Sequence, residues 1–153
     1  SLTHKGSAGS VSTYFAGWKG ALEKASAAET KYQIPTKFKI IESGNGVGNI
    51  VITLSSAKDQ DGYSGFTKST VDGNEILKSQ ITIYDVGNLS DEMLSAIIRH
   101  EFGHAIGLGH STAPEDLMAP SISMQVPYIS ECDVSAVTKL YDGVAMGRTI
   151  CKR

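Results

Sequence analysis

The chain has little of several features, and each shortage excludes a class of protein. No apolar run approaches the roughly 18–20 residues that cross a bilayer, so we expect no membrane segment. The net charge is −2 without a long basic run, which argues against nucleic acid or an anionic membrane as a partner. Internal repeats, linkers and low-complexity tracts are also missing. With 41% hydrophobic residues, residues 1–153 are expected to form one globular domain.

Cysteine is nearly absent, and the two that occur, Cys132 and Cys151, lie near the C-terminus. Two cysteines allow one intramolecular pairing. They are either free thiols, as in a cytosolic protein, or one bridge that ties the tail to the body. Such a bridge would contribute about 3 kcal/mol in the chain-entropy model. We favour the disulfide.

Periodicity predicts the elements of the first half. Apolar residues recur at helical spacing from Ser10 to about Ala28. Four stretches then read as strands: KFKII, NIVITL, SGFTKSTV and ILKSQITIYDV. Asp72-Gly73 predicts a hairpin turn between the last two. The glycine-rich SGNGVGN precedes a β-branched strand rather than a helix, so it predicts a loop and not a phosphate site.

Capping signals predict two further helices. Ser90 is a good N-cap followed by two acidic residues, and SECD after Ile129 resembles a capping box with Asp in place of Glu.

Between two of the predicted strands, DQDG at Asp59–Gly62 holds two carboxylates but lacks the rest of a calcium-loop pattern. We expect a solvated turn there, which leaves a calcium ion unsupported.

Histidine is also scarce, yet three of the four lie in RHEFGHAIGLGH, from Arg99 to His110. His100 and His104 are four apart, so on a helix they project from one face and can bind a single metal ion. Glu101 stands beside them, where a carboxylate can take a proton from a metal-bound water. Gly107 predicts a sharp helix end that returns His110 to the metal. Three imidazoles with an open fourth position are typical of a catalytic zinc site.

Two plainer explanations of this segment carry less weight. If these histidines formed a surface cluster without a metal ion, the five positions of the segment that fit a zinc site would have arisen in that order by chance. A purely structural zinc usually has a closed, cysteine-rich shell, and neither cysteine lies in the segment.

HEFGHAIGLGH resembles the metzincin signature H-E-x-x-H-x-x-G-x-x-H. Ser111 and the following TAPEDLMAP are similar to the matrixin branch, the matrix-metalloproteinase type, and Met118 matches the methionine of its Met-turn. ISECDVSAVTKLY is similar to the closing matrixin helix. The resemblance implies an α+β catalytic domain with three helices and a twisted, mostly parallel sheet of four or five strands with an antiparallel edge strand. It further implies an upper subdomain of about residues 1–108 and a lower one of about 109–153.

The chain also departs from that pattern. SLTHKGSAGS is a poor candidate for the strand that usually precedes the first matrixin helix. No histidine lies between His4 and His100, so we do not expect the second, structural zinc. The inhibitory cysteine motif of the propeptide is missing, and position 120 is Pro rather than the extra Tyr ligand of other metzincins. The residues indicate a minimal matrixin-like domain with one catalytic zinc.

The resemblance implies a zinc metalloendopeptidase that hydrolyses internal peptide bonds by attack of a zinc-bound water, with Glu101 as general base. The substrate would lie extended along an edge strand around Gly65–Lys68, which places Phe66 and Thr67 in the binding site. The main alternative is a zinc-binding scaffold with little turnover, and a peptidase for short or terminal peptides ranks below it. We expect a secreted or extracellular monomer whose signal and any propeptide lie outside this chain.

Specificity is expected from the pocket for the side chain just after the cleaved bond. Ala96 lies one turn before His100 on the same helical face and contributes only a methyl group. The opposite wall should come from Pro120 to Tyr128, which carries no charge. We therefore expect a deep, uncharged pocket that prefers Leu, Met or a larger apolar side chain, unless Tyr128 folds inward and closes its floor.

Overall fold

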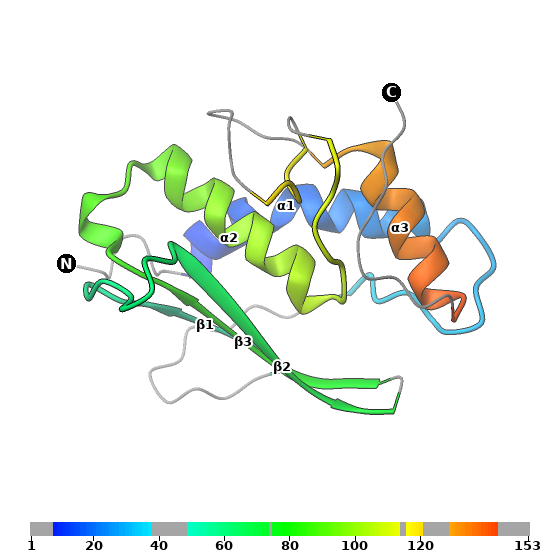
Figure 1. The fold of residues 1–153 in the computed structure, drawn as a ribbon. Helices are drawn as coiled ribbons and strands as arrows, with labels where there is room; N and C mark the ends of the chain where they lie inside the picture. Colours follow the sequence, from blue (N-terminus) through cyan, green and yellow to red (C-terminus); the bar gives the residue numbers. More distant parts are fainter. Residues whose placement is uncertain (1–7, 38–48, 74, 114–115, 121–128, 144–153) are drawn as a thin grey trace.

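The computed structural model describes residues 8–37, 49–73, 75–113, 116–120 and 129–143. Over these residues the protein is α+β, and three helices cover one face of a mixed sheet (Figure 1). The class and the three helices confirm the expectation. The elements are α1 (Ala8–Ala25), β1 (Ile50–Leu54), β2 (Gly65–Asp72), β3 (Glu75–Ile83), a 3-10 turn (Val86–Asn88), α2 (Asp91–Ala105) and α3 (Glu131–Tyr141).

The sheet is mixed, with the strand order β1-β3-β2. β1 runs parallel to the central β3, and β2 runs antiparallel to it, as expected of an antiparallel edge strand. Within the described part of the chain the sheet has three strands. The predicted strand KFKII and the loop SGNGVGN fall largely on residues 38–48, outside the described residues. The predicted total of four or five strands therefore stays a prediction.

The hairpin between β2 and β3 forms where it was predicted. Asp72 pairs with Glu75, and Gly73 has a φ of 59°, which favours glycine. The predicted end of the last strand at Val86 is wrong, because β3 ends at Ile83. Asp85 adopts a left-handed φ of 52°, and its N–H donates to the carbonyl of Ala57 at 2.8 Å. This contact draws the chain off the sheet toward the loop after β1.

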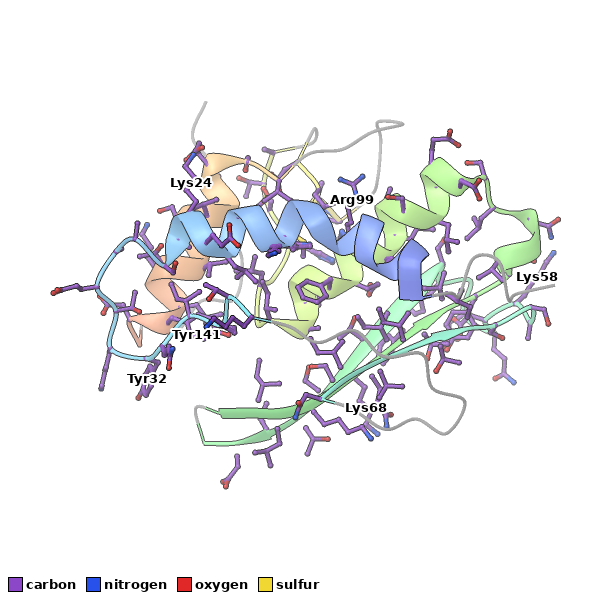
Figure 2. All side chains as sticks on the ribbon, turned by 180° about the vertical axis from the view of Figure 1, so that it is seen from behind. Lys24, Tyr32, Lys58, Lys68, Arg99 and Tyr141 are labelled. Atoms are coloured by element: carbon purple, nitrogen blue, oxygen red, sulfur yellow. The ribbon has the colours of Figure 1, made fainter. Side chains whose placement is uncertain are left out.

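α1 ends at Ala25, three residues before the predicted end at Ala28. Beyond it the chain turns back to meet α3, and the Tyr32 N–H donates to the Tyr141 carbonyl at 2.8 Å. An ion pair between Lys24 and Glu131 joins the end of α1 to the start of α3. Figure 2 shows Lys24 beside the first turn of α3, and Tyr32 next to Tyr141 at the other end. α1 and α3 therefore lie side by side and support the helix between them and the sheet.

Two apolar clusters meet α2 from opposite sides. Members of the first come from α1, α2, α3 and the segment before Pro120: Trp18, Leu22, Phe102, Leu117, Met118 and Val137. Members of the second join α2 to the sheet: Ile81, Ile83, Leu94, Ile97 and Ala105. Burial on both sides holds α2 rigidly. Among the described residues, no helix is long and apolar enough to cross a membrane.

Candidate metal centre

α2 begins as the sequence predicts. The Met93 N–H donates to the Ser90 side chain at 3.1 Å, and Asp91 and Glu92 occupy the positive end of the helix dipole. The helix continues through Ala105, so His100 and His104 lie one turn apart on the same face.

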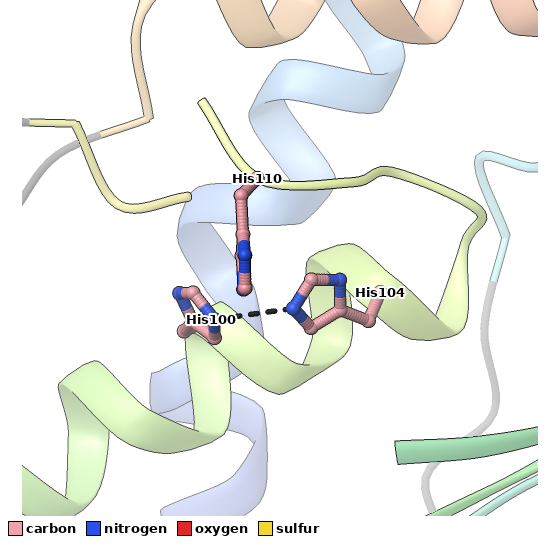
Figure 3. A group of neighbouring side chains, drawn as sticks. All are labelled: His100, His104 and His110. Atoms are coloured by element: carbon pink, nitrogen blue, oxygen red, sulfur yellow. Dashed lines mark hydrogen bonds between the residues drawn. The ribbon is translucent and has the colours of Figure 1, made fainter. Parts of the chain in front are cut away.

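Gly107 ends the helix and turns the chain back. Its φ is 109°, and the Leu108 N–H donates to the Gly103 carbonyl at 3.0 Å. A Cβ at Gly107 would also lie 2.6 Å from Leu140 Cδ2. This exit, predicted from the sequence, brings His110 over the helix. Figure 3 shows its ring facing the rings of His100 and His104.

The three imidazoles form a compact cluster. Their ring centroids are 4.8–5.4 Å apart, and one nitrogen from each lies within 4.8 Å of the others. His100 Nδ1 lies 2.7 Å from the Leu117 carbonyl, and His104 Nδ1 lies 2.7 Å from the Leu108 carbonyl. A carbonyl oxygen only accepts, so both rings donate Nδ1–H and keep the proton there. The Nε2 lone pairs of both rings are therefore available to a metal ion.

The donor set fits zinc. The Nε2 atoms of His100 and His104 are 3.2 Å apart. Two nitrogens that each lie about 2.0–2.1 Å from a tetrahedral zinc ion are about 3.3–3.4 Å apart. Burial lowers the pKa of His100 to about 4 and also lowers that of His110, which favours the neutral form of both rings. Neutral imidazoles are the form that binds a metal ion.

Glu101 is buried beside the histidines, with 5% of its surface exposed. Burial raises the pKa of its carboxyl to about 7, against the opposing effect of a hydrogen bond from Thr67. The Thr67 hydroxyl lies 3.3 Å from Glu101 Oε1 and 3.1 Å from the Glu101 carbonyl oxygen. A carboxyl whose pKa is near neutrality suits a group that both takes and returns a proton.

Met118 lies beneath the histidine-bearing turn of α2. It is fully buried, and a Cβ on Gly103 would lie 2.3 Å from its sulfur. Its carbonyl accepts the Ser111 N–H at 2.7 Å, which joins the Met118 segment to the chain just after His110. The predicted Met-turn role requires this placement, and the role itself remains a proposal.

Sequence reasoning missed a pair of buried acids behind the site. Asp116 is 1% exposed and Asp133 is fully buried. Asp116 Oδ2 accepts the Met118 N–H at 2.9 Å, and Asp133 Oδ2 accepts the Ser130 N–H at 3.1 Å in the predicted capping box. Burial, together with the hydrogen bond and charge of Asp116, raises the pKa of Asp133 to about 8. The Asp in SECD was visible in the sequence, but nothing there paired it with Asp116.

The residues expected to bind substrate are only partly brought together. Phe66 is exposed on the edge strand, whereas Thr67 turns toward Glu101. Ala96 is fully buried in α2, and Pro120 is exposed. Tyr128 lies outside the described residues, as does Cys151, so the pocket and the disulfide with Cys132 stay predictions.

Comparison with known proteins decides the family. The family model for matrixins matches residues 19–142, which is most of the chain. The chain belongs to the matrixin family. The match includes the histidine cluster, Met118 and the whole of α3.

Individual relatives match this matrixin over shorter stretches. Human matrix metalloproteinase-20 is 43% identical over 51 residues, which is 31% of this chain and 11% of that protein. Canine matrix metalloproteinase-9 is 47% identical over 49 residues, 31% of this chain and 7% of that protein. Mouse matrix metalloproteinase-25 is 32% identical over 97 residues, 54% of this chain and 16% of that protein. The matched part of the chain is therefore a small fraction of these relatives' length.

Proposed function

We propose that this matrixin is a zinc-dependent metalloendopeptidase that hydrolyses internal peptide bonds. One observation carries the proposal. Two histidines donate Nδ1–H to backbone carbonyls and turn Nε2 toward a third histidine, and the buried Glu101 carboxyl lies next along the same helix. Family membership supports the same activity.

The metal would be held by His100, His104 and His110, with Met118 as an apolar floor that is not a ligand. A bound zinc ion supplies Lewis acidity, which lowers the pKa of water toward neutrality and polarises a peptide carbonyl. The burial of His100 and the two carbonyl contacts fix the rings before any ion binds. This preorganisation reduces the cost of holding the ligands in place.

Glu101 would move the proton. Its carboxyl takes the proton of the attacking water at Oε1 or Oε2 and then returns it to the leaving amine nitrogen. Burial of Glu101 raises the pKa of its carboxyl above that of an exposed glutamate, which makes it a stronger proton acceptor. The low exposure of its side chain also keeps bulk water from competing for the proton.

The substrate would lie extended along β2. In the described sheet β2 pairs with β3 on one side only, so the other edge can accept a peptide as an added strand. Phe66 and Lys68 are exposed on this strand. Backbone pairing recognises an extended chain, and the uncharged pocket next to Ala96 would add the preference for an apolar side chain after the cut.

The alternative is a zinc-binding scaffold of matrixin fold with little turnover. The buried Glu101 favours the enzyme, because a scaffold needs no proton acceptor beside its metal.

The test is cleavage of a random peptide mixture by the zinc-loaded protein, read by mass spectrometry with and without a chelator. We expect internal cuts that the chelator abolishes. Glu101→Gln should keep zinc and fold while losing most activity, because the proton acceptor is gone. Glu92→Gln, an exposed glutamate on the same helix, is the matched control and should cleave like wild type. Undiminished cleavage by Glu101→Gln would contradict the mechanism, and zinc binding without cleavage by wild type would favour the scaffold.

We also propose that the protein acts outside the cell as a monomer, with a Cys132–Cys151 bridge. The relatives it matches are matrix metalloproteinases, and a disulfide persists in an oxidising compartment.

A further inference from the structure

We propose that Thr67 and Gly65 on β2 position the Glu101 carboxyl for proton transfer. This inference rests on the proposed peptidase function and assigns Thr67 a role different from substrate contact. Thr67 is a positioning residue here, because it acts on the substrate only through Glu101.

The Thr67 hydroxyl makes two contacts with one residue. It lies 3.3 Å from Glu101 Oε1 and 3.1 Å from the Glu101 backbone carbonyl oxygen. The contact with the carbonyl oxygen joins the edge strand to α2 at Glu101, the residue whose side chain must be oriented for proton transfer. The hydroxyl has a single proton, which is shared between these two acceptors, so the contact that anchors the hydroxyl also reaches Oε1.

Alternation along β2 explains why this hydroxyl faces the helix. Gly65 and Thr67 are half-buried, whereas Phe66 and Lys68 are exposed, as the twofold repeat of a strand requires. Thr67 also pairs across the sheet with Ile81, which is buried against α2. The central strand thus pairs with the strand that carries the hydroxyl and also packs against α2, the helix that carries Glu101.

Gly65 allows the strand to approach this closely. A Cβ at Gly65 would lie 3.1 Å from Glu101 Cγ, 2.9 Å from Ile97 Cγ2 and 3.2 Å from Ile83 Cδ1. All three distances are shorter than ordinary van der Waals contacts, and the shortest, to Ile97, would force neighbouring atoms to move. Gly65 therefore lets β2 pack close to the Glu101 stem, and Thr67, two residues further along on the same face of the strand, contacts the carboxyl.

A single hydrogen bond to a catalytic carboxyl changes the rate rather than binding. If Thr67 only positions Glu101, its loss misaligns the proton acceptor in the transition state and leaves the bound substrate in place. If Thr67 contacts the substrate instead, its loss weakens binding. The split between kcat and KM separates the two roles.

The experiment compares Thr67→Val, which keeps the shape and removes the hydroxyl, with Thr67→Ser, which keeps the hydroxyl. In the zinc-loaded protein we expect Thr67→Val to lower kcat roughly tenfold with KM unchanged, and Thr67→Ser to retain most of the rate. Thr53→Val, an exposed threonine on β1 and away from the proposed substrate strand, is the control and should behave like wild type. In the Glu101→Gln background, Thr67→Val should cause no further loss.

A crystal structure of each variant provides a readout that does not depend on turnover. Glu101 should keep one side-chain conformation in Thr67→Ser and move or occupy several in Thr67→Val. An unchanged kcat for Thr67→Val in an active enzyme, or a rise in KM alone, would overturn the positioning role. An inactive wild-type protein would count against the proposed function itself. Independently of activity, an unchanged Glu101 conformation in the Thr67→Val crystal would count against the positioning role.

Discussion

At the scale of single residues, the backbone decides what the histidines can do. The carbonyls of Leu117 and Leu108 each accept an Nδ1–H, and this assigns the proton on two rings. Both acceptors are main-chain atoms, so neither hydrogen bond uses a polar group of the Leu117 or Leu108 side chain. The nitrogens that would bind a metal ion are therefore selected by the path of the chain and not by neighbouring side chains.

One zinc ion per chain is the expected stoichiometry, and elemental analysis of the purified protein measures it. His104→Ala should reduce the zinc content to near zero after dialysis, because two imidazoles hold zinc far more weakly than three. His4→Ala, which removes the histidine outside the cluster, should leave the content at one. Two tightly held ions per chain, or full zinc content in His104→Ala, would contradict this ligand set.

Gly103 is a second single-residue determinant. A Cβ there would lie 2.3 Å from Met118 Sδ and 2.9 Å from Trp18 Cζ2, so Gly103→Ala should push Met118 away from the helix. We expect a loss of about 1–3 kcal/mol in the free energy of unfolding, from overpacking. Gly20→Ala, on exposed α1 surface with no atom within 4 Å, should be neutral or stabilising by up to about 1 kcal/mol. Chemical denaturation of both variants measures the difference, and equal stabilities would contradict the packing argument.

At the scale of elements, the Asp116–Asp133 pair joins the Met118 segment to α3. Each carboxyl accepts one backbone N–H from its own segment through Oδ2, and the two Oδ1 atoms are buried. Two buried carboxyls in contact are stable when they share one proton and repel when both are ionised. Because Leu117 lies between Asp116 and Met118, this pair also supports the carbonyl that holds His100.

The shared proton predicts how stability depends on pH. An unfolded aspartate loses its proton near pH 4, whereas burial and contact with Asp116 raise the pKa of Asp133 to about 8 in the folded protein. The folded state therefore binds more protons between these values, and the free energy of unfolding should fall as pH rises through this range. We expect a lower Tm at pH 9 than at pH 6 in the zinc-loaded protein.

Asp116→Asn isolates this effect, because an amide can donate to Asp133 without a shared proton. The variant should show a much flatter dependence of Tm on pH over the same range. His100 is the other titrating group that responds to the charge of Asp116, so zinc content should be checked at each pH. Parallel wild-type and Asp116→Asn curves would show that the acid pair does not set the pH dependence.

At the scale of the whole molecule, α2 depends on support from both sides. The sheet packs on one side of it, and α1, α3 and the Met118 segment pack on the other. The Trp18 indole N–H donates to the Arg99 carbonyl at 2.7 Å, which joins α1 to the helix just before the first histidine. Any constraint on the position of α3 is therefore also a constraint on the site.

The Cys132–Cys151 bridge is the prediction that belongs to this scale. Cys132 lies in the first turn of α3, so a bridge would tie the tail to the element that supports the site. Reduction should raise the mass by two hydrogens and lower the free energy of unfolding by about 3 kcal/mol. Mass spectrometry and thermal melts with and without reductant measure both. If both thiols alkylate freely in the unreduced native protein, the result would contradict the disulfide and weaken the extracellular assignment.

By itself, the sequence determined the features that follow from local rules. The start of α2 at Ser90, the capping box at Ser130, the hairpin at Gly73 and the helix exit at Gly107 all lie where spacing and turn chemistry predict them. The three histidines come together because the motif is short and one helix plus one turn builds it. Local backbone preferences suffice for such features, since few distant residues take part.

Only the tertiary structure decided which distant groups meet this motif. The Leu117 carbonyl on His100, the Thr67 hydroxyl on Glu101 and the contact of Asp116 with Asp133 join segments 17 to 34 residues apart along the chain. The end of β3 at Ile83 was likewise set by contacts of Asp85 with a distant loop. No local sequence pattern predicts which distant group a hydroxyl, a main-chain carbonyl or a single carboxyl will contact. Its partner is fixed only when apolar burial on both sides of α2 brings these segments together.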